Sequence, residues 1–189
     1  MQKIMFNDRY GLTNAVIEGR KTMTRRLIPD EFFGLTWDTR GNTLVYENEY
    51  GDFIDVRHSK YTRYKLGEVV AVSQCYNDVV REFTDLAFVP GSTNKMFVRA
   101  DLMPHQIRII GIRCERLRDI SDEECIKEGV YAGSQALEYP YYFIDTKQFL
   151  ICDYKSPREA FAALIDKVSG RGTWDRNPWV VVYEFELVK

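Results

Sequence analysis

The stretch Gly19-Arg20-Lys21-Thr22-Met23-Thr24-Arg25-Arg26 places four cations and two hydroxyl groups within eight residues. Gly19 stands where a helix commonly ends, because glycine adopts the left-handed backbone conformation without a steric penalty. From Lys21 to Pro29 the threonines alternate with other side chains, which favours an extended strand. We therefore expect a helix end to meet a strand start, with the cations at the junction.

The residues before Gly19 are predicted to form a short helix. Leu12, Ala15 and Val16 recur at three- and four-residue spacing and give one apolar stripe. Asn7 or a neighbouring aspartate can cap the first turn, because its side chain accepts a hydrogen bond from a free backbone N–H.

Two interpretations of the cations stay open on the residues alone. The carbonyl end of a helix attracts positive charge through its dipole, which would account for Arg20 and Lys21. Alternatively, the cations line a pocket for an anion or a polar base. Charge runs are more often solvated faces than sites, and the first interpretation needs no ligand.

The 189 residues are expected to form one domain, residues 1–189, with local insertions near 37–58 and 131–153. An apolar fraction of 45% is ordinary for a globular chain. The net charge of -2 gives no global signal for nucleic acid, although a local basic patch can still attract a polyanion. Basic residues cluster early in the chain, in residues 20–26 and again in 57–65.

Cysteine and histidine usage argues against a metal site. The four cysteines form no CxxC pair, and the chain has only two histidines, His58 and His105. We therefore predict no metal and no cofactor. The N-terminus has no long apolar run, and no segment is long enough to span a bilayer. A cytoplasmic protein that does not bind a membrane is expected.

The rest of the chain alternates strand patterns with short helices. A hairpin is expected over residues 35–46, and a strand buried on both faces over 69–72. Longer strands are predicted over 107–117, where Gly111 suggests a bulge, and over 180–188. A short strand is also expected from Met96 to Arg99. This pattern predicts an α+β fold, in which the strands form a small β-barrel and short helices flank it.

Two capping boxes mark helices in the second half of the chain. Ser121 with Glu124 predicts a helix that ends after Glu128, and a second helix follows the box that begins at Ser156. Glu128 then lies in the last helical turn, where the helix dipole disfavours a carboxylate. Its charge is either solvated or held by a partner such as Lys21.

Four stretches of the chain, in this order, resemble the ASCH domain, and most closely the phage and prophage branch of that family. The resemblance covers most of the chain, and its specificity lies in the joint presence and order of the motifs. They are the opening Phe6-Asn7-Asp8 helix leading into Gly19 to Arg26, the turn Leu66-Gly67-Glu68, the segment Glu115 to Glu123 with Glu128-Gly129, and the closing Trp174 to Val180.

The resemblance implies a PUA-like β-barrel with a cleft and a link to RNA. One branch of the family removes the acetyl group from N4-acetylcytidine, and its lysine, threonine and glutamate fall on Lys21, Thr24 and Glu128. A threonine hydroxyl needs a nearby base, and a lysine can serve if desolvation lowers its pKa. Strict strand alternation puts Lys21 and Thr24 on opposite faces, so they meet only if Lys21 lies in the bend before the strand.

The first functional hypothesis is a module that binds RNA or a modified nucleoside in a cleft at residues 19–26. Its phosphate contacts would come from Arg20, Lys21, Arg25 and Arg26. An aromatic ring such as Trp174 or Trp179 would stack a base, and core packing is the simpler alternative for at least one of these two tryptophans. An amidohydrolase acting on N4-acetylcytidine-like nucleosides is the second hypothesis. A ribonuclease that holds a phosphate with the same cations is the third. The sequence leaves open whether the protein is an enzyme.

Overall fold

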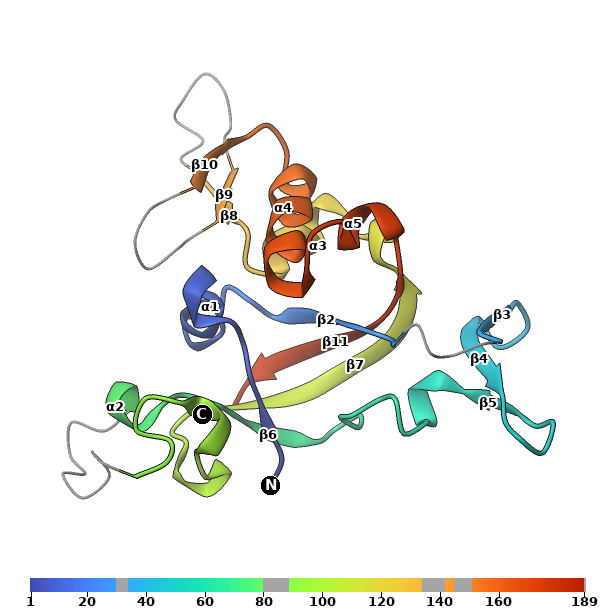
Figure 1. The fold of residues 1–189 in the computed structure, drawn as a ribbon, viewed down its shortest axis with the longest axis horizontal. Helices are drawn as coiled ribbons and strands as arrows, with labels where there is room; N and C mark the ends of the chain where they lie inside the picture. Colours follow the sequence, from blue (N-terminus) through green and yellow to red (C-terminus); the bar gives the residue numbers. More distant parts are fainter. Residues whose placement is uncertain (30–33, 80–88, 134–141, 145–150, 189) are drawn as a thin grey trace.

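A computed structural model describes residues 1–29, 34–79, 89–133, 142–144 and 151–188 of the chain. They form a mixed α+β fold, as expected, in which short helices pack around a curved central sheet (Figure 1). The central sheet has the strand order β1-β6-β7-β11-β2. Its strands are β1 (Lys3–Ile4), β2 (Met23–Leu27), β6 (Val69–Val72), β7 (Gln106–Arg116) and β11 (Trp179–Leu187).

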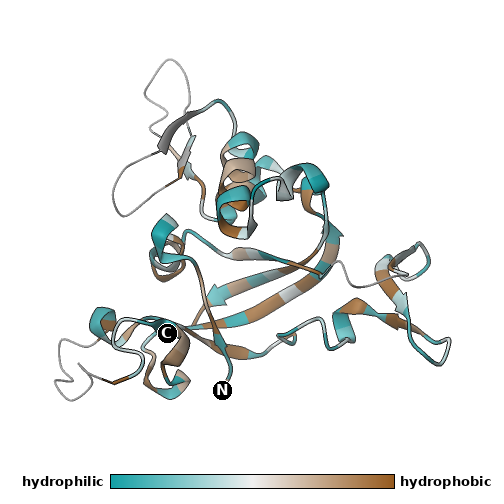
Figure 2. Ribbon diagram, viewed as in Figure 1, coloured by the Kyte–Doolittle hydropathy of each residue, from teal (hydrophilic) through white to brown (hydrophobic). Residues whose placement is uncertain are grey.

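The two longest strands, β7 and β11, form the middle of the central sheet and pair in antiparallel orientation. Strand β11 also pairs with β2, which places Thr24 opposite Tyr183. Val180, Val182 and Tyr183 are at most 1% exposed, as expected for a strand covered on both faces. Figure 2 shows hydrophobic residues recurring along β7 and β11, where the main core lies.

A β-bulge interrupts the pairing of β7 with β11 at Gly111. Glu184 lies opposite Gly111, but Phe185 lies opposite Ile109, so Ile110 is the extra residue. The predicted bulge is therefore confirmed. The extra residue interrupts the alternation of buried and exposed side chains along β7, and Ile110 is 51% exposed while the adjacent Ile109 is buried.

Ladders among the described residues leave β1 and β2 as the two edges of the central sheet. The edges approach each other, because Arg26 on β2 donates through Nη2 to the carbonyl oxygen of Met5, just after β1, at 2.7 Å. Tyr64 adds a second connection across the sheet. Its hydroxyl donates to the carbonyl oxygen of Lys3, and its ring packs edge-on against Tyr183. The central sheet is thus curled towards itself, and side chains span the gap between its described edges.

The N-terminal helix and strand meet as predicted. Asn7 caps a 3-10 turn at Asp8–Tyr10, which continues into α1 (Leu12–Ile17). Gly19 follows with φ 72°, in the left-handed region that favours glycine. Because β2 begins only afterwards, Lys21 lies in the bend between the helix and the strand.

Three helices in the second half of the chain surround one end of the sheet. Helix α3 (Asp122–Lys127) has the predicted capping box, and Glu128 is its C-terminal cap. Helix α4 (Pro157–Ser169) begins at the predicted cap Ser156 and buries its apolar face. It packs on both α3 and the short helix α5 (Thr173–Arg176).

Two further three-stranded sheets lie in the ranges expected to be insertions. The hairpin predicted over 35–46 is confirmed and gains a third strand, and residues 134–141 and 145–150 of the second insertion lie outside the described residues. The strands are β3 (Thr36–Asp38), β4 (Thr43–Glu47) and β5 (Phe53–Asp55) in one sheet, and β8 (Tyr131–Ala132), β9 (Tyr142–Ile144) and β10 (Ile151–Tyr154) in the other.

The remaining elements are short. The strand expected from Met96 to Arg99 is wrong, because Lys95–Phe97 is a single 3-10 turn. Asn94 explains the difference, since its side chain accepts a hydrogen bond from the backbone N–H of Met96 and caps the turn. The others are helix α2 (Tyr76–Val79) and the 3-10 turns Val56–His58, Ala100–Leu102 and Leu117–Asp119.

Candidate functional site

Lys21 is fixed at the point where three elements meet. Its backbone N–H donates to the carbonyl oxygen of Ala15 in α1 at 2.8 Å, and the next N–H, of Thr22, donates to Lys127 in α3 at 3.0 Å. The carbonyl oxygen of Thr22 accepts from Phe185 on β11. These bonds fix Lys21 in the bend before β2. This is the position in which Lys21 and Thr24 were expected to meet at one site.

The side chain of Lys21 reaches the carboxyl end of α3. Its Nζ donates to the carbonyl oxygen of Glu128 at 2.7 Å and to the Oε2 atom of the same residue at 2.6 Å. Of the two alternatives for Glu128, a solvated carboxylate or one held by a partner, the structure shows the second, with Lys21 as the partner. The cation does meet a helix end, as the dipole interpretation suggested, but the helix is α3 and lies about a hundred residues further along the chain.

Burial makes Lys21 a potential base. The side chains of Lys21 and Glu128 are 2% and 5% exposed. Loss of hydration lowers the pKa of Lys21 below that of a free lysine, and the negative charge of Glu128 opposes this shift only in part. The proton on Lys21 is thus held less tightly than on a lysine in water, although the amine stays hydrogen-bonded to a carboxylate.

Thr24 opens on the same pocket as this pair. The pocket, called here the Lys21 pocket, has a volume of about 510 Å³ and is lined by Lys21, Thr24, Arg25 and Glu128, among others. Thr24 is only 5% exposed, and its hydroxyl has no hydrogen-bond partner in the described part of the chain. The pocket therefore joins a free hydroxyl to a buried amine and carboxylate.

Apolar side chains form the walls of the Lys21 pocket. Phe161 and Leu164 project from the buried face of α4, and Phe6 covers the side nearest β1. The Lys21 Nζ lies 5.8 Å from the centre of the Phe6 ring, and the Arg26 guanidinium lies 5.7 Å from it. Exposed apolar residues continue the lining outward, and these are Met5, Leu27 and Val168.

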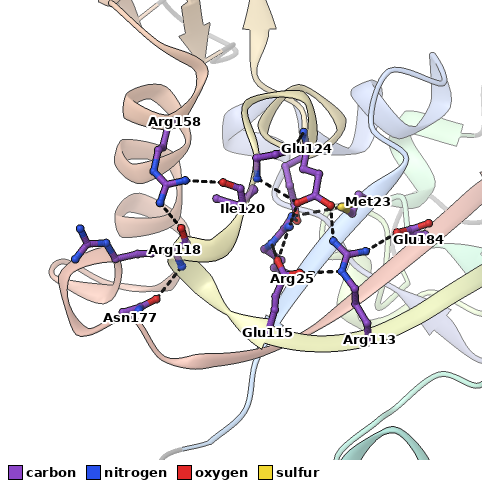
Figure 3. Close-up of polar contacts among 12 residues, drawn as sticks. Met23, Arg25, Arg113, Glu115, Arg118, Ile120, Glu124, Arg158, Asn177 and Glu184 are labelled. Carbon is purple, nitrogen blue, oxygen red and sulfur yellow. Dashed lines mark hydrogen bonds and ion pairs between the residues drawn. The ribbon is translucent and has the colours of Figure 1, made fainter. Parts of the chain in front are cut away.

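Arg25 lies at the centre of a network of carboxylates (Figure 3). Its guanidinium donates to Glu115 and Glu124 at 2.6 Å each, and to Oε1 of Glu128 at 3.1 Å. Arg113 extends the network, since it binds Glu115 and Glu124 as well. Glu128 therefore receives Lys21 on one oxygen and Arg25 on the other.

The opposite charges in this network stabilise one another. Burial works against the charge on Arg25, but the carboxylates of Glu128, Glu115 and Glu124 outweigh it and raise the pKa of the guanidinium. Burial likewise works against the charge on Glu124, and Arg25 and Arg113 reverse that effect and lower its pKa. Arg25 thus binds the protein's own carboxylates, so its guanidinium is not free to contact a phosphate as the sequence suggested.

The other predicted contact residues are dispersed. Arg26 is exposed and lines the Lys21 pocket, as expected. Arg20 does not line it, because its guanidinium pairs with Glu18 at 2.7 Å and lies 3.8 Å from the centre of the Tyr131 ring.

Trp174 does not line the Lys21 pocket either, so the predicted stacking of a base against it there is wrong. The ring packs edge-on against Phe161, and the guanidinium groups of Arg118 and Arg158 lie over it at 5.8 and 5.2 Å. Core packing, the simpler alternative, holds for this tryptophan. Trp179 instead stacks on Trp37.

Sequence reasoning missed several residues of the site. Glu115, Glu124 and Arg113 were visible only as strand or capping residues, and nothing in their spacing marks them as partners of Arg25. Nothing in the local sequence marks Phe161 as part of the wall of the Lys21 pocket. These contacts join residues that lie 90 or more positions apart, or on separate elements, which local patterns do not reveal.

Comparisons with known proteins give no match: no protein-family model, no curated protein and no solved structure is similar to the chain. Within the described residues, no three histidine, cysteine, aspartate or glutamate side chains are grouped so that they could hold a metal ion. None of the helices in the described ranges is long and apolar enough to cross a membrane.

Proposed function

We propose that the chain is an ASCH-type amidohydrolase that removes the acyl group from N4-acetylcytidine-like nucleosides in the Lys21 pocket. One observation carries this proposal. The free hydroxyl of Thr24 and the amine of Lys21, whose pKa is lowered and which Glu128 holds in place, line the same pocket. A hydroxyl, a base and a group that orients the base are the parts that acyl transfer requires.

The chemistry follows from these three groups. Neutral Lys21 accepts the proton of the Thr24 hydroxyl while the oxygen attacks the carbonyl carbon of the N4-acyl group. The carbon–nitrogen bond then breaks, and the proton on Lys21 passes to the leaving N4 amine, which releases cytidine. Water, deprotonated by Lys21, then attacks the acyl ester on Thr24. The ester bond breaks, the proton on Lys21 returns to the Thr24 oxygen, and the carboxylic acid is released. Glu128 positions the Lys21 amine through both of these steps.

The shape of the Lys21 pocket suits a nucleoside. Its volume lies within the range of about 300–1,000 Å³ that is usual for small-molecule sites. The apolar wall of α4, with Phe161 and Leu164, offers a surface for a base, while polar groups lie at Lys21 and Thr24. In this proposal the curled central sheet is a PUA-like barrel, and the contact of Arg26 with Met5 is part of its closure.

Binding of RNA or of a modified nucleoside without cleavage is a second candidate. The observation that favours it is the exposed Arg26 beside the Lys21 pocket, where a guanidinium can contact a phosphate. A ribonuclease has less support, because Lys21 and Arg25 already use Glu128 as their partner instead of presenting free charges.

Incubation of the purified protein with N4-acetylcytidine, with cytidine and acetate measured by chromatography, tests the proposal. The wild type should release both products in equal amounts. Lys21→Ala should lower the rate by about 10²-fold or more, because a positioned general base contributes about 10²–10⁴-fold. Lys21→Met serves as a second variant that keeps the buried volume, and thermal melting checks that both variants fold.

Binding without cleavage gives a different result in the same experiment. The nucleoside would then bind, as measured by calorimetry, and no cytidine would appear with the wild type or with the Lys21 variants. Such a result would overturn the hydrolase and leave the second candidate. Cytidine release that is equal in the wild type and in a folded Lys21→Met variant would also overturn the proposed role of Lys21.

A further inference from the structure

A second basic region lies away from the Lys21 pocket. Residues 56–65, called here the basic segment, contain four lysine or arginine side chains and one histidine but no carboxylate. The segment follows β5 and leads to the turn before β6. In the view of Figure 1 it runs from β5 to β6 below β7, whereas α4 lies above the sheet. Its basic residues are Arg57, His58, Lys60, Arg63 and Lys65.

The basic segment borders a cavity of its own. The cavity has a volume of about 600 Å³ and shares no lining residue with the Lys21 pocket. Two hydroxyls of the segment shape its wall, because Ser59 and Thr62 both donate to the carbonyl oxygen of Val56 and close the turn there. The lining residues are Arg57, His58, Ser59, Thr62, Lys65, Leu66 and Ile112.

Most cations of the basic segment lack a counter-ion. Arg57 pairs with Asp55 at 2.6 Å. His58, Lys60 and Lys65 are exposed, and none of them forms an ion pair with a carboxylate in the described ranges. A chain whose net charge is -2 thus collects uncompensated positive charge on one short segment. Such a surface attracts polyanions and repels other cations.

We propose that the basic segment and its cavity bind the phosphodiester backbone of a single-stranded nucleic acid. The repeating negative charge of that backbone matches the spread of cations from Arg57 to Lys65, which a small anion would not span. The exposed Leu66, at 68%, gives a base an apolar surface at the edge of the cavity. This site is independent of the proposed hydrolase and does not require Lys21.

Fluorescence anisotropy with labelled 12-nucleotide RNA and DNA strands, over a salt series, tests the proposal. Binding should weaken with salt, because phosphate contacts release counter-ions. The double variant Lys60→Gln/Lys65→Gln should reduce the slope of log K against log salt by about 1.4, which is about 0.7 for each lost contact with a single strand. The two probes distinguish RNA from DNA as the source of the phosphates, and binding of either one supports the site.

A matched double variant controls for net charge. Lys155 lies just before α4, and Lys167 lies on it. Both are exposed, and neither forms an ion pair in the described part of the chain. Lys155→Gln/Lys167→Gln should leave the salt slope unchanged. Equal losses in the two double variants, an unchanged slope in Lys60→Gln/Lys65→Gln, or no binding of either strand would overturn the proposal. Anisotropy reports nucleic-acid binding and chromatography reports cytidine release, so failure of the hydrolase and failure of this site are told apart.

Discussion

Lys21 can act as a base only because the fold removes its amine from water. A lysine on the surface keeps its proton at neutral pH, whereas Lys21 is 2% exposed and its pKa is lowered by burial. Glu128 limits this lowering of the Lys21 pKa, since its carboxylate stabilises the ammonium form. The pair therefore sets how much of the neutral amine exists at a given pH.

Titration of Lys21 checks this balance. In protein labelled with ¹⁵N-lysine, the Lys21 amine should titrate with a pKa below the ordinary lysine value of 10.5. Replacement of Glu128 by Gln should move the titration to lower pH still, because the charge that favours the ammonium form is gone. The rate of nucleoside cleavage should rise with pH as Lys21 deprotonates. Assignment rests on the loss of the signal in Lys21→Arg, and titration at the ordinary lysine value would contradict the role of burial.

Arg25 is expected to act on stability more than on ligand binding. Arg25→Met leaves Glu128 and its neighbours without their central cation, and breaking a buried ion pair by removing one partner costs about 3–5 kcal/mol. Urea unfolding should show this loss. Arg108→Met removes an exposed pair with Glu186 and should leave the midpoint close to that of the wild type. Equal midpoints for both variants would contradict the central place of Arg25.

At the scale of elements, the sequence predicted most of the features that depend on interactions within a few residues. The capping box of α3, the position of Glu128 at its end and the bend at Gly19 follow from hydrogen bonding and backbone sterics within a few residues. The phase of β7 beyond Gly111 did not follow, because a bulge moves every later side chain to the other face. Trp174 was assigned to the site, but its ring packs against Phe161 and Arg158 of α4, and this packing of α5 on α4 is not visible in the local pattern.

The end of α3 gives a prediction at this scale. Gly129 has φ 106°, and a Cβ atom there would lie 2.9 Å from Cδ2 of Leu12 and 3.6 Å from Cδ of Lys21. Gly129→Ala should therefore displace the side chain of Leu12, which lines the Lys21 pocket, and lower both stability and cleavage. Gly170→Ala is the matched control, since Gly170 has the same φ and open space around it.

The two glycine variants should share the cost of an unfavourable backbone conformation, about 1–3 kcal/mol. The clash with Leu12 adds to it only in Gly129→Ala, which chemical denaturation of both proteins would measure. A Gly129→Ala protein as stable and as active as Gly170→Ala would show that the close approach of Gly129 to Leu12 is unimportant.

At the scale of the whole molecule, the site depends on sheet order and helix packing. The central sheet brings β2 beside β11, α3 follows β7 after a 3-10 turn, and α4 packs on α3. Lys21 and Glu128 meet only because these connections return the chain to the same end of the sheet. The α+β class could be predicted from the alternation of strand and helix patterns. The approach of the two sheet edges and the packing of α4 as a pocket wall could not be predicted. Local sequence patterns allow many such arrangements equally, and the burial of apolar side chains selects one of them.

The measurement that tests the central claim most directly is cytidine release from N4-acetylcytidine by three threonine variants. Thr24→Val removes the hydroxyl at nearly constant volume, Thr24→Ser keeps a hydroxyl, and Thr22→Val makes the same change at a threonine that does not line the Lys21 pocket. If Thr24 is the nucleophile, Thr24→Val should lose release by about 10³-fold or more, because acyl transfer then lacks its attacking atom. Thr24→Ser and Thr22→Val should retain most of it. Equal release by folded Thr24→Val and Thr22→Val, or no release by the wild type, would contradict the claim.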